Sequence, residues 1–202
     1  MIAQTLKLGF LASGNGSSAR AIIAAIRTGE LAAEPRLLVS NNRTAPALAL
    51  AAAQDVPALC IATQSDPDAA DARLADAMAH HGVELIVLSG YLRQLGRQTL
   101  GRYAGRILNI HPGPLPEFGG HGMYGRRVHE AVIAAGAVES GIVIHLVDAE
   151  YDRGPAVARR NIPVAPGETA EALEARVTAL EPAFFVCTLQ RIALGQLKLP
   201  QT

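Results

Sequence analysis

Residues 6–29 read LKLGFLASGNGSSARAIIAAIRTG: an apolar run, a glycine-rich turn and an alanine-rich stretch, in that order. The run from Leu6 has the composition of a buried strand, and the stretch after the turn carries apolar residues at helical spacing. We predict a strand followed by a helix, with Ser17 or Ser18 as the N-cap and Gly29 as the end. A strand that passes through a tight turn into a helix is the basic unit of an α/β fold.

The same alternation of short Val/Ile/Leu-rich runs and longer alanine-rich stretches continues along most of the chain. It is typical of a mainly parallel sheet covered by helices. We therefore predict an α/β, Rossmann-like fold, a mainly parallel twisted sheet with helices on both faces. The other strands are expected at residues 35–40, 57–61, 84–89, 106–110, 141–147 and 156–162. The other helices are expected after a Thr44 cap ahead of Pro46, from an Asp66 cap to His81, at 97–103, at 128–135, and from a Thr169 cap to about Leu194.

The chain has 202 residues, half of them apolar, and a formal net charge of zero. This length supports one sizeable core, and we expect a single domain over residues 1–202. No apolar run approaches the roughly 18 residues of a membrane span, and the segment from Met1 lacks the features of a signal peptide. A neutral chain has no general field for nucleic acid. We expect a cytoplasmic protein that acts on small molecules, with no nucleic-acid or membrane partner.

Cysteines and histidines show no metal-ligand spacing. Cys60 and Cys187 stand far apart without a CxxC pattern, so we expect two buried thiols and neither a zinc site nor a disulfide. No metal is expected from the histidines either. His145 lies inside the apolar run GIVIHLV, where a hydrogen-bonded core residue is the expected role.

Gly14, Asn15, Gly16 and Ser17 form the turn between the first strand and the first helix. Glycines let the backbone approach a ligand closely, and a helix N-terminus offers unpaired N–H groups to an anion. A phosphate site and a tight turn that needs glycine for its dihedrals both account for this pattern. With Ala19, the turn also matches the dinucleotide fingerprint G-x-G-x-x-A.

A nicotinamide enzyme of that type needs an acidic residue at the end of the second strand to bind the ribose hydroxyls. Residues 40–43 are Ser-Asn-Asn-Arg, without a carboxylate, which disfavours NAD. Arg43 is compatible with NADP, so an NADP-dependent reductase stays as an alternative of a different class.

Asn109, Ile110 and His111 end a predicted strand, at the edge where open α/β sheets bind ligands. Side chains two apart in a strand point to the same face, so Asn109 and His111 are expected to project together. An amide beside an imidazole suits attack on a carbonyl, because the amide stabilises the oxyanion and the imidazole handles a proton or adds positive charge. The same spacing also suits an Asn and a His that satisfy loop backbone groups.

Residues 112–125, PGPLPEFGGHGMYG, hold three prolines and five glycines and are expected to form a long irregular loop. Such loops in compact domains are usually functional or mobile. The stretch NIHPGPLP at 109–116 resembles the signature of folate-dependent formyltransferases. Further motifs narrow the resemblance to the phosphoribosylglycinamide formyltransferase branch and extend it over nearly the whole chain: GNGSSARAI at 14–22, SNN at 40–42, LSGYLRQL at 88–95, GHGMYGRRVHEAV at 120–132 and YDRGP at 151–155.

The resemblance implies 10-formyltetrahydrofolate as co-substrate, the amine of N1-(5-phosphoribosyl)glycinamide as acceptor and a place in purine synthesis. It also implies roles for particular residues. These are a catalytic trio of Asn109, His111 and Asp152, a phosphate loop of Gly14, Asn15, Gly16 and Ser17, substrate contacts by Glu181 and His129, and a folate pocket lined by Leu92, Arg93, Gln94 and Leu95.

Asp152 is, from its neighbours alone, also a turn residue two positions before Gly154. If it lies near His111, its charge is expected to raise the imidazole pKa and favour the cation. Two departures from the family pattern stand out. Gly113-Pro114 replaces a Ser-Leu pair, and Pro182 replaces a His beside the substrate-contacting glutamate.

Three alternatives stay open. A formyltransferase that acts on initiator methionyl-tRNA or an amino-sugar nucleotide shares the Asn-x-His core, but the tRNA relative normally adds a C-terminal domain. A formyltetrahydrofolate hydrolase shares the trio, but usually adds an N-terminal regulatory domain. Neither addition is expected from residues 1–202, and the reductase rests only on the glycine turn. A monomer or weak homodimer is the expected state.

Overall fold

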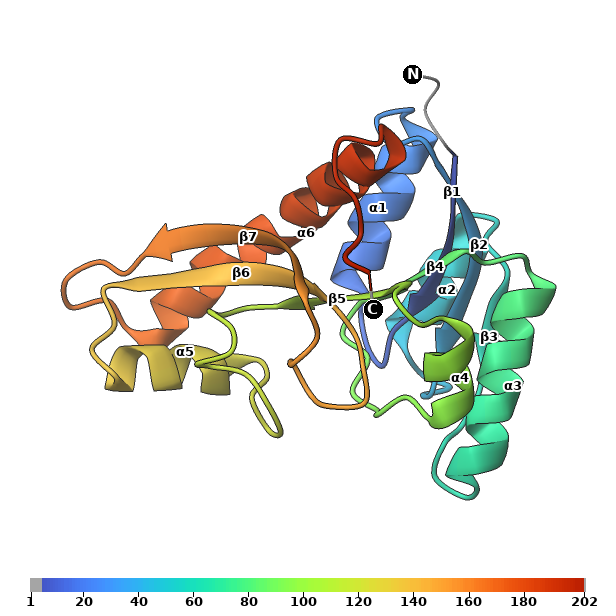
Figure 1. The fold of residues 1–202 in the computed structure, drawn as a ribbon, viewed down its shortest axis with the longest axis horizontal. Helices are drawn as coiled ribbons and strands as arrows, with labels where there is room; N and C mark the ends of the chain where they lie inside the picture. The colour runs from blue at the N-terminus through green and yellow to red at the C-terminus, as the bar shows by residue number, and fades with distance from the viewer. Residues whose placement is uncertain (1–4, 202) are drawn as a thin grey trace.

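The computed structural model describes residues 5–201; the first four residues and Thr202, where the expected domain begins and ends, lie outside it. Strands and helices alternate along the described chain as far as β6, which β7 follows with no helix between them (Figure 1). In order they are β1 (Leu6–Leu11), α1 (Ser17–Arg27), β2 (Ala33–Ser40), α2 (Pro46–Ala53), β3 (Ala58–Cys60), α3 (Pro67–His80), β4 (Leu85–Leu88), α4 (Arg97–Arg102), β5 (Ile107–His111), α5 (Arg126–Ala134), β6 (Glu139–Leu146), β7 (Ala156–Pro163) and α6 (Ala170–Ala193).

The strands form one seven-stranded sheet in the order β3-β2-β1-β4-β5-β6-β7. Neighbours from β3 to β5 pair in parallel, whereas β5–β6 and β6–β7 pair antiparallel. The predicted mainly parallel α/β sheet is therefore confirmed. The chain moves outward from β1 to β3 and then returns to β4 on the other side of β1, which creates a topological switch point between β1 and β4. Ligands of open α/β sheets bind outside the carboxyl ends of the strands at such a point.

Helices cover both faces of the parallel part of the sheet. In Figure 1, α1 and α6 lie on one side, and α3 and α4 lie on the other. Side chains of β1 pack against the helices on both faces of the sheet, because alternate side chains of a strand point to opposite faces. Leu8 and Phe10 pack with α1 and α6, while Leu11 packs with Met78 of α3. None of the helices described for residues 5–201 combines the length and apolar composition needed to cross a membrane.

Two of the four predicted helix caps are confirmed. The side chains of Asp66 and Thr169 accept hydrogen bonds from the N–H groups of Ala69 and Ala172. The predicted serine cap of α1 is wrong, because Gly16 is the N-cap and neither serine provides a side-chain cap.

The Thr44 cap is also wrong, because Ala45 is the N-cap of α2 and makes no side-chain bond.

β2 begins two residues earlier than predicted, at Ala33, because Leu6 of β1 pairs with it. Pro35 is tolerated within this strand, since β3 pairs only with residues 38–40 and leaves the outer side of β2 open there.

The expectation of two buried thiols is wrong. Cys60 is half-buried and Cys187 is exposed. Cys60 ends β3, which is the edge strand of the sheet, and Cys187 lies on α6 between the buried residues Val186 and Thr188. An apolar run in the sequence does not show which of its positions faces outward at the edge of the sheet.

Candidate functional site

The end of β5 brings the expected catalytic residues to the antiparallel half of the sheet. In the β5–β6 register, Asn109 faces His145 and His111 faces Val143. Cross-strand partners share a face of the sheet, so Asn109, His111 and His145 project on the same side. The prediction that Asn109 and His111 point together is confirmed.

Asp152 lies in the connection between β6 and β7 and reaches both imidazoles. Its Oδ2 lies 3.6 Å from Nδ1 of His111, and its Oδ1 lies 3.4 Å from Nε2 of His145. The side-chain nitrogen of Asn109 lies 3.1 Å from the same Nε2 of His145. The three residues named by the resemblance thus form one cluster, with His145 as a fourth member.

The backbone around Asp152 is adapted to this position. Its φ is +57°, a left-handed conformation that aspartate tolerates better than most residues. The N–H group of Gly120, in the long loop, donates to Oδ2 at 3.0 Å. A side chain at Gly154 would overlap the carbonyl of Leu146, so only glycine fits there. These constraints account for the aspartate and the glycine of the Y-D-R-G-P motif.

His111 is buried, and its second ring nitrogen is engaged by the loop. Nε2 lies 2.7 Å from the carbonyl of Phe118, which can only accept, so the ring hydrogen is on Nε2. Burial lowers the pKa of His111 and outweighs the opposing effects of Asp152 and the Phe118 carbonyl. The expected cation is therefore wrong for the unliganded protein, in which His111 is neutral at pH 7.

Burial would raise the pKa of the Asp152 carboxyl, but its contacts with the His145 ring, the Gly120 N–H group and His111 outweigh that effect. The pKa of Asp152 lies below its ordinary value, and the carboxylate is ionised at neutral pH. The cluster therefore holds an anionic carboxylate beside a neutral imidazole, a pair of groups that can accept a proton.

His145 is the residue of this cluster whose role the sequence did not predict. It is buried and hydrogen-bonded, as expected, but it belongs to the polar cluster and not to the apolar core. The sequence feature that could have indicated this role is a histidine in the middle of an otherwise apolar run. The role itself follows only from the antiparallel β5–β6 register, which places His145 opposite Asn109.

A cavity of about 90 Å³ opens beside this cluster. Asn109, His145 and Asp152 form one wall, and the loop after β4 forms another with Arg93, Gln94 and Leu95. Leu92, the remaining expected folate residue, is 65% exposed in the same loop. The expected folate loop and the expected catalytic residues are therefore neighbours.

The glycine turn lies at the carboxyl end of β1. Gly16 has φ +64° and ψ +46° and is the N-cap of α1, whose first turn contains no acidic residue. A Cβ at Gly16 would lie 3.0 Å from the Cβ of Ala47, whereas Gly14 has open space around it. The turn thus needs glycine at one position for its backbone, and it leaves an uncrowded helix N-terminus that suits an anion.

His129 and Glu181 do not line the cavity beside Asn109. His129 lies in α5, is 1% exposed, and its Nδ1 has no hydrogen-bond partner among residues 5–201. Glu181 lies in α6, half-buried, and burial raises the pKa of its carboxyl to about 7. Arg126 forms an ion pair with Glu174 of α6 at 2.7 Å, as a surface arginine would.

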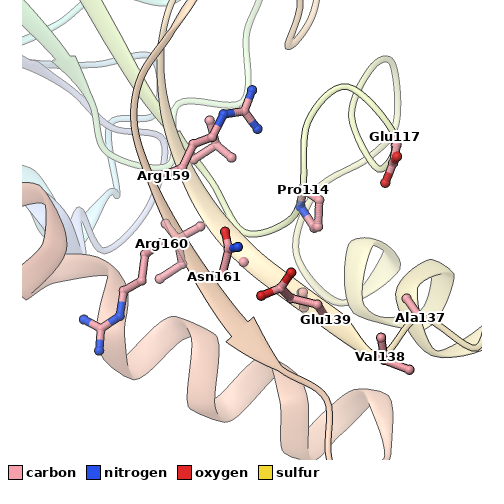
Figure 2. A pocket seen from close by; sticks show the side chains of 12 residues that line it. Pro114, Glu117, Ala137, Val138, Glu139, Arg159, Arg160 and Asn161 are labelled. Atoms are coloured by element: carbon pink, nitrogen blue, oxygen red, sulfur yellow. The ribbon is translucent and has the colours of Figure 1, made fainter.

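A larger cavity of about 360 Å³ lies farther along β6 and β7 (Figure 2). Pro114 and Glu117 come from the long loop, and Glu139 and Arg159 come from the hairpin. Nη1 of Arg159 donates to the Leu115 carbonyl at 3.0 Å and ties the loop to β7. None of the expected site residues lines this cavity, so its size does not mark it as the reaction site.

Comparison with known proteins adds independent information. A family model described as formyl transferase matches residues 6–189. The chain is 37% identical over 182 residues to the chloroplastic phosphoribosylglycinamide formyltransferase of Vigna unguiculata, covering 89% of this chain and 58% of that protein. It is 32% identical over 188 residues to the phosphoribosylglycinamide formyltransferase of Bacillus subtilis (strain 168), covering 92% of this chain and 94% of that one.

Among solved structures, the phosphoribosylglycinamide formyltransferase from Coxiella burnetii superposes with a TM-score of 0.87 at 34% identity. The match covers 98% of this chain and 92% of that one. The chain therefore spans little more than half of the plant relative and nearly all of the bacterial relatives.

Proposed function

The chain belongs to the formyl transferase family, among the phosphoribosylglycinamide formyltransferases, and from this membership we propose that it transfers the formyl group of 10-formyltetrahydrofolate to the amine of N1-(5-phosphoribosyl)glycinamide in purine biosynthesis. The observation that carries the proposal is the cluster of Asn109, His111 and Asp152 beside a cavity walled by residues 93–95. An amide can donate a hydrogen bond to the oxyanion formed in formyl transfer to an amine, and a carboxylate with a neutral imidazole can accept the amine proton.

In the proposed reaction, the amine nitrogen of the acceptor attacks the formyl carbon of the donor. A nitrogen–carbon bond forms, and the formyl oxygen becomes an oxyanion that receives a hydrogen bond from Asn109. The bond between the formyl carbon and N10 of the folate then breaks. The amine loses one proton and N10 gains one, so the net charge of the reacting groups is unchanged.

His111 and Asp152 carry that proton. Asp152 lines the cavity and can take the proton from the amine, directly or through a water. Nδ1 of His111 bears a lone pair and faces Oδ2 of Asp152 at 3.6 Å, so the proton can rest between them. While it does so, the imidazolium lies close to the oxyanion and adds electrostatic stabilisation. The neutral state of His111 before the reaction is the state that this step needs.

The ligand contacts are proposed from the resemblance together with the geometry. Gly14, Asn15, Gly16 and Ser17 bind the phosphate at the N-terminus of α1. Leu92, Arg93, Gln94 and Leu95 hold the pterin part of the folate. Glu181 and His129 contact the acceptor, with His129 requiring a local movement because it is buried. A single domain over 1–202, a cytoplasmic location, a monomer or weak homodimer, and the absence of metal or nucleic-acid partners belong to the same proposal.

The test is incubation of the full chain with 10-formyltetrahydrofolate, with and without the glycinamide ribonucleotide. We expect loss of formyl from the folate only when the amine is present, with one formylated product per folate consumed. Loss of formyl without amine would assign the chain as a hydrolase, and no loss in either case would overturn both assignments. An oxidation assay with NADPH covers the reductase alternative.

A further inference from the structure

The Ser40-Asn41-Asn42 motif and Ser13 have no part in the reaction described above, yet they join the two proposed ligand loops. Ser13 ends the segment after β1 and begins the phosphate turn. β4 lies next to β1 and is followed by the loop over residues 89–96, which carries the proposed folate residues. Ser13 therefore sits at the switch point of the sheet, between the two loops.

Ser13 bonds to two segments at once, the loop over residues 89–96 and the segment after β2 that holds Asn41 and Asn42. Its N–H group donates to the Gly90 carbonyl at 3.0 Å, and its hydroxyl accepts from the N–H group of Leu92 at 2.8 Å. The same hydroxyl donates to Oδ1 of Asn41 at 2.6 Å. The side-chain nitrogen of Asn42 lies 3.4 Å from the Ser13 carbonyl. Because Asn41 takes the hydroxyl hydrogen, the oxygen lone pairs are left for Leu92.

A second hydrogen bond also joins the phosphate turn to the loop over residues 89–96. The N–H group of Ala19, in the first turn of α1, donates to Oγ of Ser89 at 3.0 Å, and Ser89 is buried. The helix N-terminus that is proposed to bind the phosphate is thus attached to the start of the folate loop. Within that loop, Leu92 is 65% exposed, so its backbone depends more on the bond to Ser13 than on packing.

We propose that Ser13 is a positioning residue that couples the two ligand sites, so that a phosphate bound at the glycine turn favours binding of the pterin donor by the loop over residues 89–96, and the reverse. This inference rests on the proposed function. Phosphate binding fixes the turn that holds Ser13, and Ser13 then holds the N–H group of Leu92 in the conformation that lines the cavity. Coupling between two sites is reciprocal by thermodynamic necessity.

The test measures the Kd of 10-formyltetrahydrofolate with and without saturating ribose 5-phosphate, which has the phosphate but no amine and cannot accept a formyl group. For the unmodified chain we expect ribose 5-phosphate to lower this Kd by about fivefold or more. Ser13→Ala should abolish the enhancement and raise the KM of the donor more than it lowers kcat. Ser13→Thr keeps a hydroxyl and should restore the enhancement.

Thr44→Ala is the matched control, because it removes a neighbouring hydroxyl that, within residues 5–201, bonds to Asn42 and not to Ser13 or the loop over residues 89–96. It should leave the enhancement unchanged, and thermal denaturation of each variant shows whether the fold is retained. The proposal is overturned if the unmodified chain shows no enhancement, if Ser13→Ala keeps it, or if Thr44→Ala loses it equally. Each of these results can occur while formyl transfer by the unmodified chain is intact, so they are distinct from failure of the proposed function.

Discussion

The side-chain amide of Asn109 lies 3.1 Å from Nε2 of His145, across the antiparallel pair of β5 and β6. Nδ1 of His145 lies 2.8 Å from the carbonyl of Leu146, which can only accept, so Nδ1 carries a hydrogen. Nε2 of the same ring also lies 3.4 Å from Oδ1 of Asp152. The His145 ring therefore contacts both Asn109 and Asp152 and holds their side chains in place relative to each other.

We expect His145→Leu to lower kcat by about tenfold, because the proposed oxyanion donor loses the hydrogen bond that orients it. The KM values of both substrates should change less than kcat, since leucine still fills this part of the cavity wall while the contacts of the ring with Asn109 and Asp152 are lost. His145→Gln is the control, because its side-chain oxygen can accept the same bond and should retain most of the activity. Steady-state kinetics that show normal turnover for His145→Leu would contradict the positioning role.

Asn109→Ala should lower kcat by about 10²-fold or more, the loss typical of removing one oxyanion donor. Binding of 10-formyltetrahydrofolate should be nearly unchanged, because the amide acts mainly on charge that develops during the reaction. Asn109→Asp keeps the size of the side chain but replaces the donor with an acceptor. An equal loss in both variants therefore assigns the effect to the missing N–H group, and near-normal turnover in either one would refute the assignment.

Much of the fold could be predicted from local sequence patterns, because each strand–turn–helix unit has its own apolar spacing, cap residues and glycines. Asp66 before Pro67 gave the start of α3 correctly, and Gly82, with φ +65°, ends it. The caps of α1 and α2 were wrong for a local reason. A serine or threonine near a helix start is a cap only if the backbone places its hydroxyl over the free N–H groups, and at α1 Gly16 takes that place instead.

Within the site, spacing predicted that Asn109 and His111 share a face, since both lie in one strand. Asp152 and His145 depend on how β6 and β7 fold back on β5, and no local signal reports that register. The prediction of a charged His111 was wrong for a different reason. A nearby carboxylate was expected to dominate, but the sequence does not show how deeply the ring is buried, and burial has the larger effect on its pKa.

The pKa of His111 should lie below the ordinary value of 6.5, as NMR of the ring protons across a pH titration would show. Asp152→Asn should lower it further, because the carboxylate now favours the cation. Since the unfolded chain binds a proton near pH 6.5 and the folded chain does not, His111 reduces the free energy of unfolding as pH falls below 6.5. A titration midpoint above 6.5, or an upward shift in Asp152→Asn, would contradict the dominance of burial.

Gly16→Ala should lower the free energy of unfolding by about 1–2 kcal/mol, because alanine pays a steric cost at φ +64°. The new methyl group would also crowd Ala47 at 3.0 Å. Gly14→Ala is the control in the same turn, since Gly14 has no positive φ and a Cβ added there would meet no atom of residues 5–201 within 4 Å. Urea denaturation of both variants makes the comparison, and equal stability would show that the turn does not need glycine at residue 16.

Glu181, a proposed contact of the acceptor, also affects the stability of the protein. Its pKa in the folded protein is about 7, raised from 4.5 by burial. Between these two pH values the folded state binds more protons than the unfolded state, so the free energy of unfolding falls as pH rises through this window. The destabilisation caused by the ionised, buried carboxylate is fully present above pH 7. Glu181→Gln removes the charge and should be more stable than the unmodified chain by about 1–3 kcal/mol at pH 8.

At pH 4.5 and below, the two proteins should be nearly equal in stability, because the carboxyl is then protonated in the folded chain and at least half protonated in the unfolded chain. Urea denaturation at pH 4.5 and pH 8 measures both differences. Glu171→Gln, in the same helix but with a side chain that is 77% exposed, should show no comparable gain. A Glu181→Gln variant that is less stable at pH 8 would mean that the ionised carboxylate is compensated in the folded state. Burial would then not be the dominant influence on Glu181.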